Sequence, residues 1–271
     1  MLSALIFDVD GTLADTETAH CAAFNAAFAQ MGLDWHWDRD TYQRLLAVSG
    51  GVERMAQFWR ETDPEAASSP GAEATLRALH QAKTRFYTGS TSGSAASGPL
   101  ALRPGVLRLM REARASGLRL AIATTTTPAN IAALLQPHLG AQWERWFDAI
   151  GDGHSAPVKK PHPQVYTQVL SRLGLDARSV IAFEDSANGL RAATAAGLAT
   201  VVTPTAWTRH DGFAGALAVL PSLGEPDVSS PELCVDVARL RRWHASFWRD
   251  SAAPARRRAP LIQSQLEPEL L

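Results

Sequence analysis

The sequence predicts an α/β fold in which helices flank a parallel β-sheet, with a separate helical domain inserted into it. Three observations support this fold class. Short apolar segments of β character alternate with helical patterns over most of the chain. These segments are apolar throughout, as is typical of parallel strands that are buried on both faces. Between residues 15 and 100 the alternation stops, and only helical patterns occur.

Each expected strand is an apolar run that ends in small or polar residues. These runs lie at residues 4–7, 118–123, 180–183 and 200–202, with a short fifth at 147–150. The helical patterns that separate them lie at residues 105–116, 128–139, 163–173 and 189–196. We expect a Rossmann-like sheet, in which ligands bind beyond the carboxyl ends of the strands. Because polar residues follow four of the runs, the sequence predicts one site at that edge.

The expected insertion separates the first strand from the second. Its helical patterns lie at residues 16–32, 39–47, 52–62 and 71–89. We therefore divide the chain into an α/β core of residues 1–14 and 101–224 and a helical cap domain of residues 15–100. Residues 225–271 are expected to be a C-terminal extension, partly helical near residues 231–249 or disordered.

Composition argues against several classes of protein. Of the 271 residues, 46% are apolar and 20% charged, and the formal net charge is −1. This balance creates no overall field that would attract nucleic acid or a membrane surface. The two cysteines lack C-x-x-C spacing, which predicts no disulfide framework and a reducing compartment. With no apolar stretch of membrane-spanning length and no leader pattern, we expect a cytoplasmic monomer.

Acidic residues at two strand ends are the most informative feature. Asp8 and Asp10 follow the first run and point the same way, because side chains on a strand alternate with a period of two. Burying like charges is costly unless a cation compensates them. Glu184 and Asp185 follow another run. Together these acids predict a divalent metal site, and hard carboxylate and carbonyl oxygens suit Mg²⁺.

Structural roles are an alternative for each of these acids. Asp8 could be a turn residue that ends a strand, and Asp10 could cap the turn that follows. Glu184 and Asp185 could cap the helix that begins near Ser186. The capping roles are compatible with catalysis, so they do not remove these residues from the candidate site.

Three further residues complete the candidate site of the core. Thr124 and Thr125 end the second strand, where a hydroxyl and a backbone N–H can hold a phosphoryl group. Lys160 lies in a proline-rich loop, and a fixed cation beside Asp8 would offset repulsion between like charges. Lys159 is the competing lysine.

These segments resemble the four ordered motifs of the haloacid dehalogenase-like phosphohydrolases. The motifs are Asp8-Val9-Asp10-Gly11-Thr12-Leu13, the strand end at Thr124, Lys160-Pro161 and Glu184-Asp185-Ser186. The resemblance covers residues 1–224. It is greatest to the CbbY-type sugar phosphatases, near the β-phosphoglucomutases, on residues 35–38, 80–84 and 124–130.

The resemblance implies roles for the residues of the core. Asp8 matches the nucleophile that forms an aspartyl-phosphate, and Asp10 matches the general acid and base. Classical dehalogenases lack an acid at the position of Asp10, so its presence favours phosphoryl transfer. The family pattern K-P-x-P selects Lys160. The implied Mg²⁺ ligands are Asp8, the backbone carbonyl of Asp10, Glu184 and Asp185.

The cap domain is expected to supply substrate contacts. Glu17 and His20 share one face of its first helix, and His20 resembles a position that orients Asp10 in the mutases. Two glycines before a helix would let the backbone approach a ligand, and Arg54 could clamp a second phosphate. Ordinary surface or packing roles remain open for these residues. The full set of expected substrate contacts is Glu17, His20, Tyr42, Gly50, Gly51, Arg54, Lys83 and Thr125.

The resemblance implies a Mg²⁺-dependent phosphatase that hydrolyses a small phosphosugar. The subgroup implies hydrolysis of xylulose-1,5-bisphosphate to xylulose 5-phosphate in a Calvin-cycle setting. One alternative is a phosphomutase of the β-phosphoglucomutase type, which would use the same residues. Another is a non-catalytic phosphosugar sensor, which predicts loss of Asp8, Asp10, Lys160 or Asp185. Since the sequence keeps all of them, we favour the enzyme.

Overall fold

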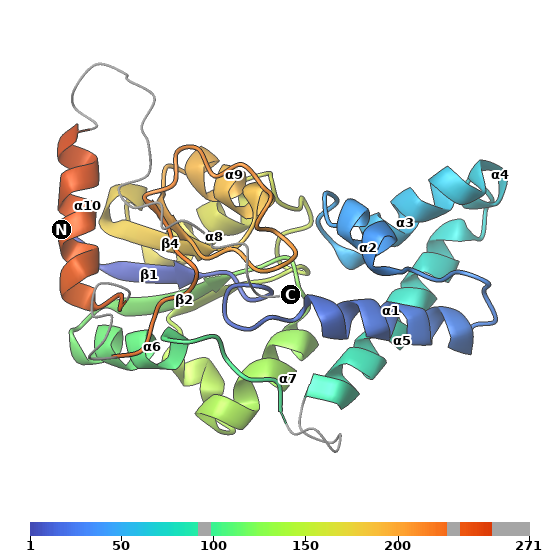
Figure 1. Ribbon diagram of the computed structural model, residues 1–271, viewed down its shortest axis with the longest axis horizontal. Helices are drawn as coiled ribbons and strands as arrows, with labels where there is room; N and C mark the ends of the chain where they lie inside the picture. The colour runs from blue at the N-terminus through green and yellow to red at the C-terminus, as the bar shows by residue number, and fades with distance from the viewer. Residues whose placement is uncertain (92–98, 227–233, 251–271) are drawn as a thin grey trace. The chain divides into compact units, whose positions relative to one another are not determined.

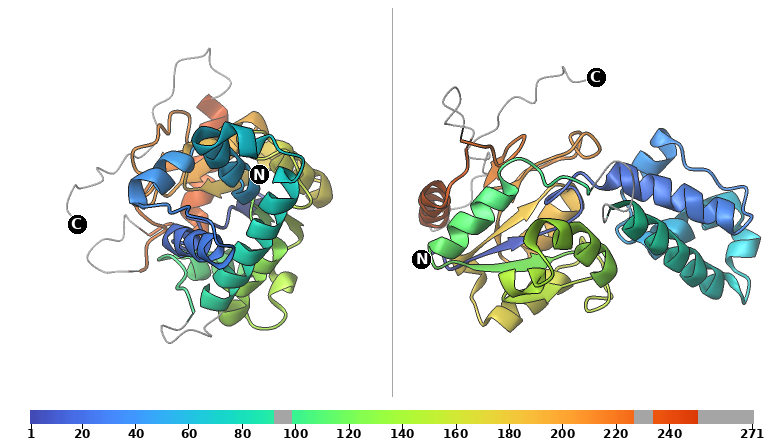
Figure 2. Two further views of the ribbon diagram at one scale, coloured as in Figure 1. Left: turned by 90° about the vertical axis from the view of Figure 1, so that its right-hand side faces the viewer. Right: turned by 90° about the horizontal axis from the view of Figure 1, so that it is seen from below.

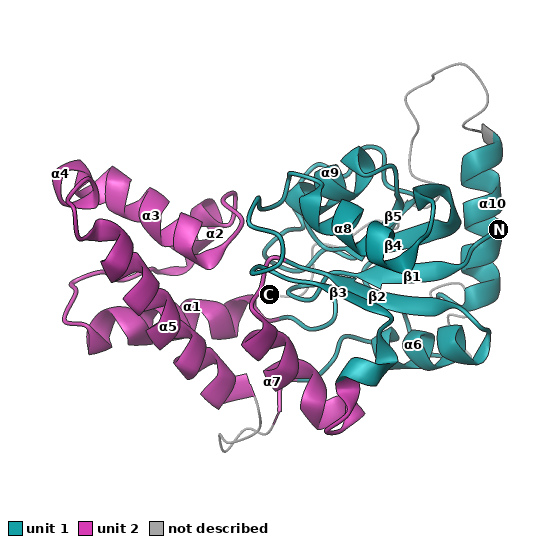
Figure 3. Cartoon of the chain, turned by 180° about the vertical axis from the view of Figure 1, so that it is seen from behind, with its two compact units in different colours: residues 1–15, 101–124, 144–271 teal, residues 16–100, 125–143 magenta. Residues whose placement is uncertain are grey.

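A computed structural model describes residues 1–91, 99–226 and 234–250. Within these residues the chain forms two compact units (Figure 3). The first contains residues 1–15, 101–124 and 144 onwards, and the second contains residues 16–100 and 125–143. None of the helices described combines the length and the apolar character needed to span a lipid bilayer.

The first unit contains a parallel sheet with the strand order β3-β2-β1-β4-β5-β6, and Figure 1 labels β1, β2 and β4 of this sheet. Its strands are β1 (Ala4–Phe7), β2 (Arg119–Ala123), β3 (Ala149–Gly151), β4 (Val180–Glu184), β5 (Ala199–Val202) and β6 (Ala218–Val219). Every neighbouring pair is parallel, and this order is that of the Rossmann fold. The predicted fold class is therefore confirmed. The pair of residues in β6 was not predicted.

The register of the sheet aligns the ends of its three central strands. Phe7 of β1 pairs with Ile122 of β2 and Phe183 of β4. The rings of Phe7 and Phe183 stack with their centroids 4.6 Å apart. The residues that follow this row therefore emerge side by side at the carboxyl edge of the sheet.

Helices cover both faces of this sheet (Figures 1 and 2). On one face lie α8 (Gln164–Leu173) and α9 (Ala187–Ala195), and on the other α6 (Val106–Ala115) packs against β2. One hydrophobic cluster joins alternate strand residues to α8 and α9: Ala4, Ile6, Ala121, Ala123, Val180, Ala182, Val165, Tyr166, Val169, Ala192 and Ala193. Because side chains alternate along a strand, Leu5 and Ile122 point to the face of α6.

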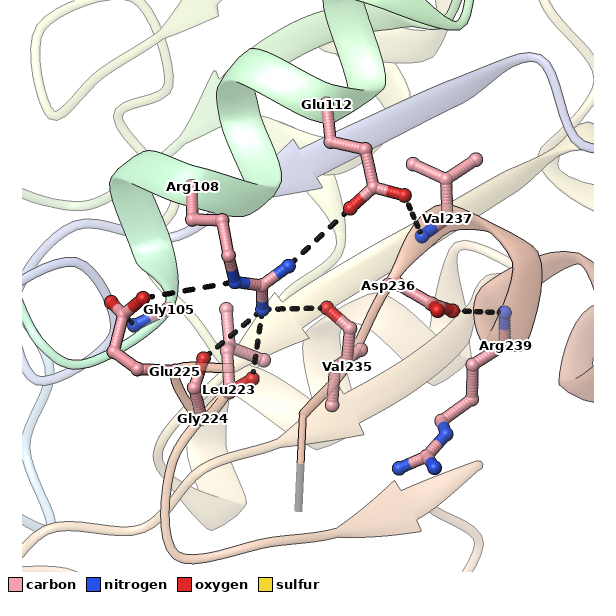
Figure 4. Close-up of polar contacts among 10 residues, drawn as sticks. All are labelled: Gly105, Arg108, Glu112, Leu223, Gly224, Glu225, Val235, Asp236, Val237 and Arg239. Carbon is pink, nitrogen blue, oxygen red and sulfur yellow. Dashed lines mark hydrogen bonds and ion pairs between the residues drawn. The ribbon is translucent and has the colours of Figure 1, made fainter. Parts of the chain in front are cut away.

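The C-terminal extension contains α10 (Val237–Asp250), which packs against α6. Arg108 of α6 donates hydrogen bonds to the carbonyls of Leu223, Gly224 and Val235, and Glu112 accepts one from the Val237 N–H (Figure 4). These bonds fasten the segments on either side of residues 227–233 to α6. The disorder expected for the end of the extension concerns residues 251–271, which lie outside the described residues.

The second unit is helical. It contains α1 (Glu17–Gln30), α2 (Arg39–Leu45), α3 (Gly51–Thr62), α4 (Pro64–Ala67), α5 (Ala72–Thr91) and α7 (Pro128–Leu139). Helices α1 and α5 pack along each other, and α7 packs against α5. An aromatic cluster that includes Phe24, Phe28 and Trp37 fills its interior. Short 3₁₀ turns, η1 (Trp143–Trp146) and η2 (Ala177–Ser179), complete the secondary structure described.

Candidate active site

Three acidic side chains from two strand ends meet at the carboxyl edge of the sheet. Asp8 directly follows β1, and its N–H donates to the carbonyl of Phe183 at 3.0 Å, which extends the ladder between β1 and β4. Glu184 is the last residue of β4, and Asp185 follows it. One carboxylate oxygen from each of Asp8, Glu184 and Asp185 lies within 4.8 Å of the others, and all three residues are buried. Such a group is costly in the absence of cations.

Lys160 supplies one compensating charge. Its Nζ donates to Oδ1 of Asp8 at 2.7 Å, to Oε1 of Glu184 at 2.7 Å and to the carbonyl of Ala123 at 2.9 Å. Three bonds use every donor of an ammonium group. Burial opposes the charge of Lys160, but the two carboxylates outweigh burial and raise its pKa. Lys160 therefore remains protonated, whereas Lys159 donates to the backbone carbonyls of Gly153 and Ala156.

One lysine does not compensate the negative charge of Asp8, Glu184 and Asp185 together. Burial raises the pKa of Asp8 to about 7; Lys160 lowers it, and Glu184 and Asp10 add to the increase. Because burial disfavours a charged carboxylate, Asp8 would be partly protonated near neutral pH. A second cation close to Asp8 would favour its ionised form.

Two glycines leave the space that the acidic side chains occupy. A Cβ atom on Gly189 of α9 would lie 1.8 Å from Oε2 of Glu184, and one on Gly11 would lie 2.2 Å from Oδ2 of Asp185. Gly11 also has a φ of 77°, which favours glycine. Oε2 of Glu184 is buried and has no hydrogen-bond partner among the described residues. An orphaned carboxylate oxygen beside two other acids fits a divalent cation, and oxygen donors suit Mg²⁺ or Ca²⁺.

Tyr166 of α8 belongs to this site although the sequence analysis did not predict it. Its hydroxyl donates to Oε1 of Glu184, and Nζ of Lys160 lies 5.1 Å from the centre of its ring. Burial, reinforced by the negative charge of Glu184, raises the pKa of Tyr166 well above its usual value. The hydroxyl therefore stays protonated and holds Glu184 in place. Its position on the apolar face of a helix gave no signal that distinguished it from a core residue.

Two other predicted residues of the core lie at the same edge. Thr124 follows β2, is buried, and donates its N–H to the carbonyl of Gly151 at 3.0 Å. Asp10 is half-buried, and its backbone forms a bridge with Ala14. The Asp10 side chain is not one of the three clustered acids. A metal contact through its backbone carbonyl stays a prediction.

In the helical unit, side-chain hydrogen bonds connect Glu17 to Tyr42 and Tyr42 to Arg54. The Tyr42 hydroxyl donates to Oε2 of Glu17 at 2.5 Å and accepts from Nη1 of Arg54 at 2.9 Å. Tyr42 is fully buried, and burial raises its pKa well above the usual value, with the charge of Glu17 adding to the effect. The neutral tyrosine thus fixes the acid and the guanidinium relative to each other.

A second pair in the helical unit is His20 of α1 and Lys83 of α5. Nζ of Lys83 lies 2.6 Å from Nδ1 of His20, and both side chains are buried. The His20 ring stacks on that of Tyr87 with the centroids 4.0 Å apart. These contacts hold His20 and Lys83 against each other between α1 and α5.

Gly50, Gly51 and Thr125 were also predicted as substrate contacts, and backbone conformation or packing accounts for the two glycines. Gly50 caps α3 with a φ of 96°, a conformation that favours glycine. A Cβ on Gly51 would lie 3.0 Å from the His80 ring, so packing already explains this glycine. Thr125 is half-buried at the start of the segment that leads to α7.

Comparison with known proteins places the chain in a family. A family model described as haloacid dehalogenase-like hydrolase matches residues 2–197. The chain belongs to this family. The predicted family and the predicted hydrolase of the phosphatase type are thereby confirmed.

Its relatives include CbbY proteins. Protein CbbY of Cupriavidus necator is 56% identical over 250 residues, which span 90% of this chain and 97% of the relative. The crystal structure of CbbY from Rhodobacter sphaeroides with phosphate has a TM-score of 0.76 and 42% identity, covering 86% of this chain and all of that one. A variant of the same protein, crystallised with xylulose-(1,5)bisphosphate, also has a TM-score of 0.76 and 42% identity, and covers 88% of this chain and all of that one.

Proposed function

We propose that this hydrolase is a Mg²⁺-dependent phosphatase of sugar phosphates that works through an aspartyl-phosphate on Asp8. The observation that carries the proposal is the contact of a buried, charged Lys160 with both Asp8 and Glu184, within a group of three acids that can hold a cation. A scaffold has no need to bury three carboxylates around one lysine. A phosphatase that forms an aspartyl-phosphate needs a carboxylate nucleophile beside positive charge that accommodates the phosphate.

Asp8 is the proposed nucleophile. Its carboxylate attacks phosphorus, and the bond between phosphorus and the sugar oxygen breaks. The product is an acyl phosphate, the aspartyl-phosphate of Asp8. Asp10 donates a proton to the departing sugar oxygen, which makes it a better leaving group.

Asp10 then acts as a base in the second half of the reaction. It takes a proton from water, and the water oxygen attacks phosphorus. The bond between phosphorus and Asp8 breaks, so inorganic phosphate leaves and both aspartates return to their starting states. Splitting one displacement into two allows each to be assisted by a positioned group.

The cation and the phosphate have proposed ligands at the same edge of the sheet. Asp8, the carbonyl of Asp10, Glu184 and Asp185 would hold Mg²⁺, which would neutralise charge on the transferred phosphoryl group. Thr124 and Thr125 would hold that group by a hydroxyl and a backbone N–H. The ammonium of Lys160, whose three N–H groups are bonded to Asp8, Glu184 and Ala123, would add positive charge beside it.

We further propose residues 15–100 as the cap domain and a sugar bisphosphate as the substrate. A related CbbY was crystallised with xylulose-(1,5)bisphosphate, which makes that compound the first candidate, and a Calvin-cycle setting goes with it. In the helical unit Glu17, His20, Tyr42, Gly50, Gly51, Arg54 and Lys83 are the proposed substrate contacts. A monomeric, cytoplasmic enzyme without nucleic-acid or membrane partners completes this proposal.

Phosphate release from a panel of sugar monophosphates and bisphosphates, with Mg²⁺ or with a chelator, tests this function. We expect release that requires Mg²⁺ and is fastest with a bisphosphate of a five-carbon sugar. Accumulation of an isomeric sugar phosphate with little free phosphate would identify a phosphomutase instead. If the protein bound Mg²⁺ but released phosphate from no sugar phosphate, the proposal would be wrong.

A further inference from the structure

Arg103 joins three loops at the carboxyl edge of the sheet. Its Nη1 donates to the carbonyls of Gly11 and Thr203, and its Nη2 donates to those of Pro204 and Pro221, both at 2.9 Å. These acceptors follow β1, β5 and β6. The four N–H groups of the two terminal nitrogens therefore each have a backbone carbonyl to bind.

The loop after β1 is held by Arg103 from two sides. Besides the bond from the side chain to the Gly11 carbonyl, the backbone N–H of Arg103 donates to the carbonyl of Leu13 at 2.8 Å. The Gly11 N–H in turn donates to the carbonyl of Ala14 at 2.8 Å. The two bonds of Gly11 hold the peptide groups on both sides of that residue, and through them the backbone from which the Asp10 side chain leaves.

The nucleophile is fixed independently of Arg103. Asp8 is tied to the sheet by its bond to Phe183, and its carboxylate is bound by Lys160. Removing the guanidinium should therefore disturb residues 10–14 more than Asp8.

From this placement we propose that Arg103 is a positioning residue for phosphoryl transfer, which fixes the proton donor and acceptor Asp10 through the carbonyl of Gly11. The inference rests on the proposed function, because it assumes that Asp10 moves protons in the reaction. Arginine suits this role, since its planar guanidinium offers donors in fixed, divergent directions. A lysine has one nitrogen with three donors and cannot reproduce the same set of bonds.

Arg108 provides a matched control. It also binds several backbone carbonyls, those of Leu223, Gly224 and Val235, but none in the loop after β1 (Figure 4). Arg103→Met and Arg108→Met each remove a guanidinium that crosslinks loops of the same unit. Both variants should lower the midpoint of thermal unfolding, whereas only the first should alter catalysis.

The test compares these variants by burst kinetics with p-nitrophenyl phosphate and by steady-state hydrolysis of a sugar phosphate. Transfer of phosphate to Asp8 releases p-nitrophenolate, a good leaving group that needs no proton from Asp10. Arg103→Met should therefore keep the burst of p-nitrophenolate, while the later release of phosphate slows. With a sugar phosphate we expect kcat to fall by about 10- to 100-fold, the usual range for a supporting residue, with little change in KM.

Three other results are distinguishable. If Arg103→Met behaved like Arg108→Met, or lost burst and turnover in proportion, the positioning role would be wrong. If Arg103→Met did not fold, Arg103→Lys and Arg108→Lys would replace the two methionine variants. Arg103→Lys should then have a kcat between that of the wild type and zero, with the burst retained. Equal kcat values in Arg103→Lys and Arg108→Lys would overturn the inference. If the wild-type protein hydrolysed no phosphate ester, the proposed function itself would fail, and this role with it.

Discussion

Nζ of Lys160 lies 2.7 Å from Oδ1 of Asp8, although 152 positions separate the two residues in the chain. The same Nζ binds Glu184 at an equal distance. One buried cation thus holds the ends of β1 and β4 together and partly compensates the acids that gather there. Breaking a buried ion pair by removing one partner is strongly destabilising, because the remaining charge has lost its compensation.

Lys160→Met should therefore lower the free energy of unfolding by about 3–5 kcal/mol and abolish phosphate release. Urea denaturation in the absence of metal measures the first effect. Lys159→Met is the control, since Lys159 contacts only backbone carbonyls in the contacts described. Equal losses of stability in the two variants would contradict the role given to Lys160.

The affinity for Mg²⁺ should depend on pH through Asp8. In the metal-free protein its pKa is about 7, so below that pH a cation must displace a proton. The affinity should rise about tenfold per pH unit below 7 and level off above it. Calorimetric titrations between pH 5.5 and 8.5 check this, and Asp8→Asn should flatten the curve. A wild-type affinity independent of pH would show that Asp8 is not a ligand.

The same pKa predicts how stability varies with pH when metal is absent. The pKa of Asp8 is raised in the folded protein from 3.8 to about 7, so the folded state binds more protons between these values. The contribution of Asp8 to stability is therefore present below pH 4 and is lost as the pH rises through 7. Thermal unfolding of Asp8→Asn, compared with wild type in a chelator, should lack this decline. If the stability of the two proteins varied with pH in parallel, the predicted contribution of Asp8 would be ruled out.

Gly189→Ala tests whether the absence of a side chain at position 189 allows the Glu184 carboxylate to take its position. The added Cβ would lie 1.8 Å from Oε2 of Glu184, so the carboxylate must leave its present position. We expect a loss of about 1–3 kcal/mol in stability and weaker Mg²⁺ binding. Gly212→Ala is the control, because a Cβ there has no neighbour within 4 Å. Unchanged Mg²⁺ affinity in Gly189→Ala would exclude Glu184 from the metal site.

Arg54→Ala tests whether Arg54 binds a second phosphate group of the substrate. Loss of a charge-assisted contact should raise KM for a sugar bisphosphate by about 10-fold or more, and KM for the monophosphate much less. Arg60→Ala is the matched control, since Arg60 lies on the same helix, donates to Gln57 and is not a proposed substrate contact. Equal increases in KM for the two substrates would defeat this assignment.

Local sequence patterns were sufficient to predict the central strands and the acids at their ends. The apolar run before Asp8 and the run before Glu184 are long enough to identify β1 and β4, and the parallel arrangement then brings their ends together. The two residues of β6 have no periodicity to detect. Residues 125–143 follow a strand of the sheet in sequence, yet they group with the helical unit, which no local pattern indicates.

Residues that support the site were missed because their roles depend on tertiary contacts. Tyr166 lies on the apolar face of α8 and reads as a core residue until the position of Glu184 is known. Gly189 lies inside a helix, where the sequence shows only an unfavourable residue; its reason is the carboxylate beside it. Arg103 precedes a proline and a glycine at a helix start and has the composition of an ordinary loop.

Trapping the phosphorylated enzyme tests the central claim most directly. The protein is mixed with Mg²⁺ and a sugar phosphate labelled in the transferred group, quenched in acid within milliseconds, digested and mapped by mass spectrometry. We predict label on the peptide that contains Asp8, lost in Asp8→Asn and chased to inorganic phosphate in the wild type. Label on another residue, or steady turnover with no labelled peptide at any time, would contradict the mechanism.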